Sequence, residues 1–341
     1  MKRFSGYSFF VAAFFVLMCH FVFQTPAAFA TDPTVLRYAG SFPINHHCTR
    51  GQELFAKLVM EKTNKVKIEV YPASQLFADK DMPRAVSTAV LDIGILTPGL
   101  ITGQIPLILA NDIPFLFKDR AHMHRWVDSE VGEIFRQEFE KKGYHLLYLM
   151  DFSGFGLAST KPIKTLEDFK GKRIRGMGEM AVEGLRALGA APTFISSGEV
   201  YLALQRNTID GGMSGWTTFY ERKYYEVAKY LTDPGYSVGT MMVAVNKRIW
   251  DGLPKDVQQI MMAAGKEAQA WGRKECEKMD IQDLQELKEK GMQYYVVPEK
   301  ERERWRAGSI GPCTEIFLKR IDDQQKGKRI LEIAEKLRAS N

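Results

Sequence analysis

The chain lacks the short motifs that mark common enzyme classes. Its 341 residues contain no G-x-S-x-G nucleophile turn, no H-E-x-x-H zinc motif, no Walker loop and no G-x-G-x-x-G dinucleotide fingerprint. Asp210 precedes a glycine at the end of an expected strand, where aspartate forms a turn more often than it serves as an acid. These absences favour ligand binding over catalysis, so the sequence predicts no catalytic residue, no cofactor and no enzyme activity.

Cysteine and long runs of one charge are also scarce. Three cysteines follow the first 30 residues, at positions 48, 276 and 313. Export would permit a bridge between Cys276 and Cys313, but three thiols at these spacings define no disulfide framework. Without its first 30 residues, which hold two basic residues and no acid, the chain keeps 45 basic and 41 acidic residues, a net charge of +4. This weak bias, without a basic block, argues against a nucleic-acid partner.

The chain has only one long hydrophobic run, and this run lies at the N-terminus. Lys2 and Arg3 precede an apolar stretch over residues 9–23, and Ala28-Phe29-Ala30 offers a small-residue cleavage site before Thr31. The stretch is shorter than the about 20 residues of a spanning helix, and no second one follows. We interpret residues 1–30 as a cleaved signal peptide and expect an exported protein without a membrane span after cleavage.

Strand-like and helix-like segments alternate along the rest of the chain. Short apolar or alternating runs predict strands at 35–40, 66–71, 91–96, 144–150, 172–175 and 240–245. An almost unbroken helical pattern over residues 254–290 would form a helix about 54 Å long, more than one lobe across. The roughly 310 residues after the signal peptide are too many for one ordinary core and suggest two lobes of an α/β protein.

The region from 161 to 236 carries several motifs in a fixed order. It reads K-P-I-K-x-L-E-D-F-K-G-x-x-I-R, then A-L-G-A-x-P, then E-V-Y-x-A-L-Q-x-x-x-I-D-G, then K-Y-Y-E-V-A-K-Y-L-T. This series resembles the extracytoplasmic solute receptors of TRAP transporters, the DctP family. The resemblance extends more weakly over residues 36–291.

The resemblance implies a two-lobed periplasmic-binding-protein-like fold with a hinge and a long helix that spans both lobes. We place lobe I at residues 31–152 and 241–280, and lobe II at 153–240 and 281–341. The chain would first cross between the lobes at the glycine- and serine-rich run 151–156.

An arginine at the end of a strand can offer two parallel hydrogen bonds to a carboxylate. The resemblance places the ligand clamp at such a residue, Arg175. Two departures from the family pattern limit what carries over: Phe155 stands where several members have a second arginine, and Ser214 replaces an asparagine. A monoanion with an apolar or compact body therefore fits better than a dicarboxylate or a sugar acid. Other expected contacts are Trp216, exposed at a strand exit, together with Tyr236 and Phe152.

Two loops supply further candidates. The loop before the first expected helix carries Asn45, His46 and His47, and the resembled family uses this loop to line its cleft. Thr97 follows a buried strand, and ligands of α/β sheets lie at the carboxyl ends of strands. An ordinary turn is an equally good interpretation of Thr97. The run His46-His47-Cys48 also invites a metal interpretation, but adjacent residues rarely converge on one ion, so we expect no metal.

The resemblance implies a receptor that closes on a small carboxylate or sulfonate and delivers it to the small and large membrane subunits of a TRAP transporter. We expect a monomer. A receptor for an ABC importer or a sensor kinase is the first alternative, and a periplasmic enzyme on a two-lobed fold is the second.

Overall fold

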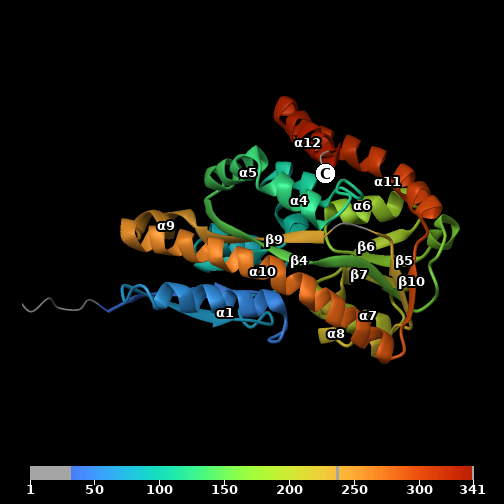
Figure 1. Ribbon diagram of the computed structural model, residues 1–341, viewed down its shortest axis with the longest axis horizontal. Coiled ribbons are helices and arrows are strands. Elements are labelled where there is room, and N and C mark those ends of the chain that lie inside the picture. Colours follow the sequence, from blue (N-terminus) through green and yellow to red (C-terminus); the bar gives the residue numbers. More distant parts are fainter. Residues whose placement is uncertain (1–31, 236–237, 340–341) are drawn as a thin grey trace, which may run out of the picture. The chain divides into compact units, whose positions relative to one another are not determined.

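A mixed ten-stranded sheet runs through the part of the chain that the computed structural model describes, residues 32–235 and 238–339 (Figure 1). Its main path follows the order β2-β1-β3-β9-β4-β7-β5-β6, while β8 pairs with β4 and β10 pairs with β8. The predicted signal peptide, residues 1–30, lies outside the described residues. The strands are β1 (Thr34–Ala39), β2 (Val66–Tyr71), β3 (Ile93–Leu96), β4 (Tyr144–Ser159), β5 (Arg173–Gly176), β6 (Ala191–Phe194), β7 (Gly211–Gly215), β8 (Tyr230–Asp233), β9 (Val238–Asn246) and β10 (Gln293–Val296).

Helices cover this sheet, and none in the described segments is long and apolar enough to cross a membrane. The α-helices are α1 (His47–Met60), α2 (Met82–Ser87), α3 (Pro98–Ile101), α4 (Arg120–Val127), α5 (Glu130–Lys141), α6 (Glu179–Ala187), α7 (Val200–Gln205), α8 (Trp216–Glu221), α9 (Lys247–Gly252), α10 (Lys255–Glu289), α11 (Glu299–Arg320) and α12 (Gln324–Ala339). The 3₁₀ helices are η1 (Pro106–Asp112), η2 (Leu166–Phe169), η3 (Ser197–Glu199) and η4 (Tyr224–Glu226).

Strand β4 joins two groups of strands. Most of it pairs antiparallel with β9, which also pairs with β3, whereas its end pairs with β7 and β8. We call β1, β2, β3 and β9 the first strand group, and β5, β6, β7, β8 and β10 the second. The β4–β9 register shifts between Asp151 and Ser153, which marks an irregularity where the strand passes from one group to the other.

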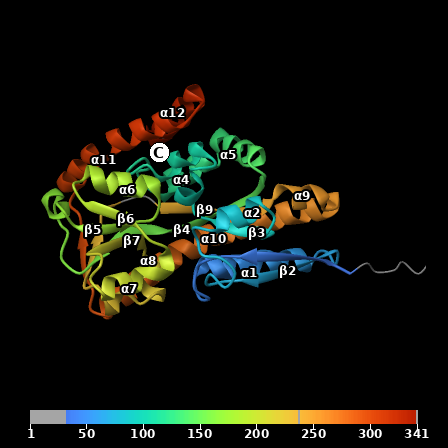
Figure 2. The ribbon, with the colours of Figure 1, turned by 180° about the vertical axis from the view of Figure 1, so that it is seen from behind.

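The predicted long helix is present as α10, with 35 residues and a length of about 52 Å. It contacts α1 beside the first strand group, crosses β4, and reaches α8 beside the second. Figure 1 shows it crossing the sheet from the α9 end toward α8. In Figures 1 and 2, α6 lies on one side of the second strand group and α7 and α8 lie on the other. The mixed α/β fold with a long helix is therefore confirmed.

A buried ionic cluster fixes α10 against β4 and α4. The Arg120 guanidinium donates to the Asp151 carboxylate at 3.2 Å and also pairs with Asp280 of α10. Asp280 further accepts hydrogen bonds from the hydroxyl of Ser153 and the amide of Gly154. This cluster thus joins three elements at the point where β4 changes partners.

The structure answers one question that the sequence left open, the pairing of the cysteines, and it shows where α8 ends. Cys276 and Cys313 are both buried free thiols, so the bridge that export would permit is not formed. Helix α8 ends early, at Glu221, because Lys223 takes a left-handed conformation with φ of 55°. That early end places the side chain of Arg222 at a helix terminus, where it reaches the site described next.

Candidate functional site

A polar chamber lies between the loops that follow the first strand group and the strands of the second. The loops after β1, β2 and β3 contribute Ser41, Asp79 and Thr97. The second strand group and its connections contribute Arg175, Ser197, Ser214, Thr218 and Arg222, and β4 and β9 add Phe152 and Met241. Loops after parallel strands converge here because the carboxyl ends of such strands share an edge, as expected for a ligand site in an α/β sheet.

Arg175 is the central cation of the polar chamber and is only 4% exposed. Its Nε donates to the carbonyl of Ile195 at 3.0 Å and its Nη1 donates to the carbonyl of Met213 at 3.1 Å. No carboxylate in the described parts of the chain lies within 4 Å of this guanidinium. Burial lowers the pKa of Arg175, although Tyr224 and Asp79 act in the other direction. The side chain is therefore held rigidly while its charge has no direct counter-ion.

Arg222 is a second cation in the same chamber, and the sequence analysis missed it. Its Nη2 donates to the carbonyl of Ser41 at 2.7 Å, while its Nε is buried without a hydrogen-bond partner among the described residues. Burial lowers its pKa too. Since no local motif marks this position, only the early end of α8 brings it into the chamber.

Asp79 supplies the negative charge of the polar chamber. One of its oxygens accepts a hydrogen bond from the amide of Ser197 at 3.0 Å, and the other accepts from the amide of Lys80. Burial acts to raise its pKa, but the hydrogen bonds from Ser197 and Ser196 and the charge of Arg175 lower it overall. With two guanidinium groups and one carboxylate, the chamber keeps a formal charge of +1.

An apolar chamber adjoins the polar one, and Thr97, Met177 and Met241 line both. Its other walls include Phe155, Ala181 and Met213, with Asp112 and Thr240 as polar members. The ring of Phe155 lies directly over Gly239. It has room there because Gly239 lacks a Cβ, which would come within 2.4 Å of the ring. The polar chamber suits the charged end of a ligand, and the adjoining apolar chamber suits its apolar body.

Residues 39–319 match the bacterial extracellular solute-binding proteins of family 7, over four fifths of the chain. The chain is a family 7 solute-binding protein. It is 29% identical over 282 residues to the C4-dicarboxylate-binding periplasmic protein DctP of Rhodobacter capsulatus, covering 80% of this chain and 84% of that protein. This agrees with the resemblance drawn from residues 161–236.

Solved TRAP periplasmic solute-binding proteins share the fold of this family 7 member. The protein from Desulfovibrio salexigens with bound orotic acid is 26% identical, with a TM-score of 0.85, covering 89% of this chain and 98% of that one. The protein from Sulfurospirillum deleyianum with bound succinate is 27% identical, with a TM-score of 0.82, covering 91% and 100%.

The structure of this family 7 protein brings together five of the ten residues expected to contact ligand. Arg175, Ser214 and Phe152 line the polar chamber, Phe155 lines the apolar chamber, and Thr97 lines both. The remaining five have other positions. Asn45 is exposed, and Tyr236 lies outside the described residues.

Trp216 is packed in the interior, not exposed at the strand exit as expected. Its side chain is 6% exposed, and its ring fills the space over Gly154 and Gly156, where an added Cβ would come within 2.7 and 2.1 Å of it. It also makes edge contacts with Phe219 and Tyr294. Trp216 is absent from the described lining of both chambers, and its glycine neighbours make room for an indole from inside the fold.

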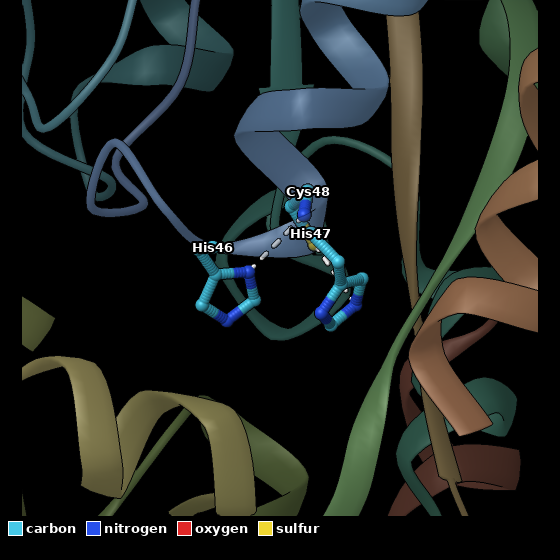
Figure 3. Close-up of side chains that lie close together, drawn as sticks. All are labelled: His46, His47 and Cys48. Atoms are coloured by element: carbon cyan, nitrogen blue, oxygen red, sulfur yellow. Dashed lines mark hydrogen bonds between the residues drawn. The ribbon is translucent and has the colours of Figure 1, made fainter. Parts of the chain in front are cut away.

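His46 and His47 lie behind the polar chamber with Cys48, and Figure 3 shows the three side chains at the start of α1. Their ligand-type atoms lie within 4.8 Å of one another. However, the Nδ1 atom of His46 accepts a hydrogen bond from the Cys48 amide and so caps the helix. His47 contacts the carbonyl of Asp151 through Nε2, at 3.0 Å.

Little in this histidine and cysteine cluster is available to hold a metal. Of the four ring nitrogens of His46 and His47, Nδ1 of His47 is the one without a hydrogen-bond partner among the described residues. Burial raises the pKa of the Cys48 thiol well above its usual value. The ring of His46 instead stacks on Phe42, with centroids 4.6 Å apart, and so supports the wall of the polar chamber.

Proposed function

We propose that this protein is the periplasmic receptor of a TRAP transporter and captures a small organic anion with a single negative charge. The observation that carries the proposal is the pairing of the buried Arg175 with the partly buried Arg222, offset by the one carboxylate of Asp79. A buried, hydrogen-bonded cation without a counter-ion is costly to maintain, and a ligand carboxylate or sulfonate would supply the missing charge. The formal charge of +1 matches one such group.

The ligands of the relatives support an organic anion. The protein from Rhodobacter capsulatus is described as binding C4-dicarboxylates, and the two solved structures hold orotic acid and succinate. These compounds share a carboxylate and differ in the remainder of the molecule. We therefore assign the carboxylate, or an isosteric sulfonate, to Arg175 and expect the apolar chamber to select the rest.

We infer that capture closes two lobes over the ligand, with lobe I formed by residues 31–152 and 241–280 and lobe II by 153–240 and 281–341. Contacts at the rim of the polar chamber support this division. Asp79 accepts from Ser197, and Arg222 donates to the carbonyl of Ser41, so each contact joins the two strand groups. A ligand that binds Arg175 from lobe II and the loops of lobe I would favour the closed state.

The partner in this proposal is the pair of small and large TRAP membrane subunits in the inner membrane, to which the closed receptor delivers its ligand. The family of the chain and the TRAP solute-binding proteins that share its fold support this partner. The receptor returns the ligand unchanged, so we propose no catalytic role for any residue.

The test is a thermal-shift screen of residues 31–341 against small carboxylates and sulfonates, followed by calorimetric titration of the compounds that stabilise the protein. A ligand at about 100 times its Kd should add roughly 2.7 kcal/mol to the free energy of unfolding. We expect Arg175→Gln to abolish the shift, while Arg173→Gln, altered two residues away on the same strand, leaves it unchanged. Arg173 is the matched control because it is exposed and pairs with Asp210. Equal ligand affinity in the Arg175 variant and the wild type would refute the assignment.

A further inference from the structure

The apolar chamber is where a ligand held by Arg175 has room for the remainder of its structure. The two chambers share Thr97, Met177 and Met241, so a molecule can extend from one into the other without leaving the protein. Methionine, alanine and phenylalanine side chains form most of the walls of the apolar chamber, which suits hydrocarbon. A group with many hydroxyls would leave hydrogen bonds unmade there.

Asp112 is the one charged side chain in the described lining of the apolar chamber. Asn111 donates to its Oδ1 at 2.9 Å, and the hydroxyl of Thr240 donates to Asn111 at 2.8 Å, which orients the amide. The backbone amide of Gly99 donates a further hydrogen bond to the carboxylate. The negative charge of Asp112 is therefore held in place by donors from two different elements, η1 and α3.

The fixed charge of Asp112 has a consequence for any ligand with two anionic groups. Burial raises the pKa of Asp112 to about 6, against the hydrogen bonds from Asn111 and Gly99. At neutral pH the carboxylate is still mainly ionised. A second ligand carboxylate in this chamber would face a like charge among apolar walls, where repulsion is weakly screened.

We propose that Asp112 is a specificity-determining residue that restricts the receptor to ligands with a single anionic group, an apolar body and a far end that is neutral or donates hydrogen bonds. This inference rests on the proposed function, because it takes the ligand carboxylate to lie at Arg175. The expected class is a monocarboxylate of several carbons, with dicarboxylates and sugar acids disfavoured by charge and by unpaired hydroxyls respectively.

The experiment compares four compounds of the same carbon count: butanoate, 4-hydroxybutanoate, 4-aminobutanoate and succinate. Each keeps one carboxylate for Arg175 and changes only the group at the far end. We expect wild-type affinity for succinate to be about tenfold or more below that for butanoate, because of the charge at Asp112. The compounds with a hydroxyl or ammonium should bind at least as well as butanoate.

Asp112→Asn removes the charge while keeping the size of the side chain. We expect the preference for butanoate over succinate to fall by about tenfold, with butanoate affinity changed by less than about threefold. Asp79→Asn is the matched control, since Asp79 lies in the polar chamber beside the shared carboxylate and should alter both affinities in parallel. If Asp112 has only a structural role, Asp112→Asn should lower the affinities for butanoate and succinate together and leave their ratio unchanged.

If Asp112→Asn does not fold, the wild-type ratio of succinate to butanoate still tests the proposal, and a second variant tests its premise that the ligand body occupies the apolar chamber. Ala181→Leu narrows the apolar chamber without touching Asp112, and should lower the affinity for hexanoate about tenfold relative to acetate. If anions bind in an Arg175-dependent way but succinate equals butanoate in the wild type, or Asp112→Asn leaves the ratio unchanged, this inference fails and the proposed function stands. If no anion binds, or Arg175→Gln has no effect, the proposed function fails.

Discussion

Arg120 offers the sharpest test of how the fold is held together. It lies on α4 with its side chain 19% exposed, and it pairs with two carboxylates, Asp151 at 3% and Asp280 at 11% exposure. Arg120→Ala would leave both acids in place without the guanidinium that joins them, while Asp151 keeps its contact with His124 Nε2 at 2.7 Å and Asp280 keeps its hydrogen bonds from Ser153 and Gly154. Breaking a buried ion pair from one side destabilises a protein by about 3–5 kcal/mol. We therefore expect Arg120→Ala to lower the free energy of unfolding by about 3–5 kcal/mol.

The expected change in melting temperature follows from the size of the chain. Unfolding entropy is about 2.1 cal/mol/K per residue, which for about 310 residues gives roughly 0.65 kcal/mol/K near 60 °C. A loss of about 3–5 kcal/mol therefore lowers Tm by about 5–8 °C. Differential scanning calorimetry of the ligand-free protein measures this shift directly.

The matched control is an exposed pair made by the same residue types. Arg273 contacts Asp128 at 2.7 Å through two parallel hydrogen bonds, but the Asp128 side chain is 47% exposed. Asp128→Ala should therefore cost only about 0.2–1 kcal/mol, or less than about 2 °C. If Arg120→Ala lowers Tm no more than Asp128→Ala, the cluster does not fix α10 to β4, and the reasoning is refuted.

Three further outcomes are expected. Arg222→Gln should weaken binding of a ligand carboxylate about tenfold or more with little change in Tm, as measured by titration calorimetry, because the guanidinium lines the polar chamber. Gly178→Val should weaken ligand binding while leaving the circular-dichroism spectrum intact, since an added Cβ would lie 2.5 Å from the Cα of Gly99 across the chamber rim. Asp283→Asn should raise the free energy of unfolding by about 1–3 kcal/mol at pH 8 in urea titrations, and the gain should disappear near pH 4. Burial raises the pKa of Asp283 to about 6, so the native state binds the extra proton and loses stability as pH rises from about 4 through 6. An unchanged gain at pH 4 would contradict this assignment.

Arg175 could be predicted from the sequence because its position depends on a local pattern. Strand β5 is short and is followed by glycines, and the surrounding motif occupies one continuous stretch of the chain. The long helix could be predicted for the same reason, since its periodicity persists over 35 residues. In both cases the residues that determine the structure lie close together in the sequence.

Arg222, Asp79 and Asp112 could not be predicted in this way. They lie on three separate connections and meet at the two chambers only because the strand order brings those connections together. Trp216 shows the converse error. Glycines around it suggested exposure, whereas Gly154 and Gly156 face its ring and let it pack inside. A glycine reports that space is needed nearby, but only the fold shows which side chain takes it.

Under the proposed function, the positions of the charges would also connect ligand binding to closure. Arg175 and Arg222 come from the second strand group, while Asp79 and Asp112 come from loops of the first. Without an anion, the two cations are satisfied only in part by Asp79 and by carbonyl groups. An anion at Arg175 would complete the charge balance only while both groups of residues surround it. We therefore expect ligands of the wrong charge to bind weakly because they fail to stabilise the closed arrangement, even where they fit the volume of the chambers.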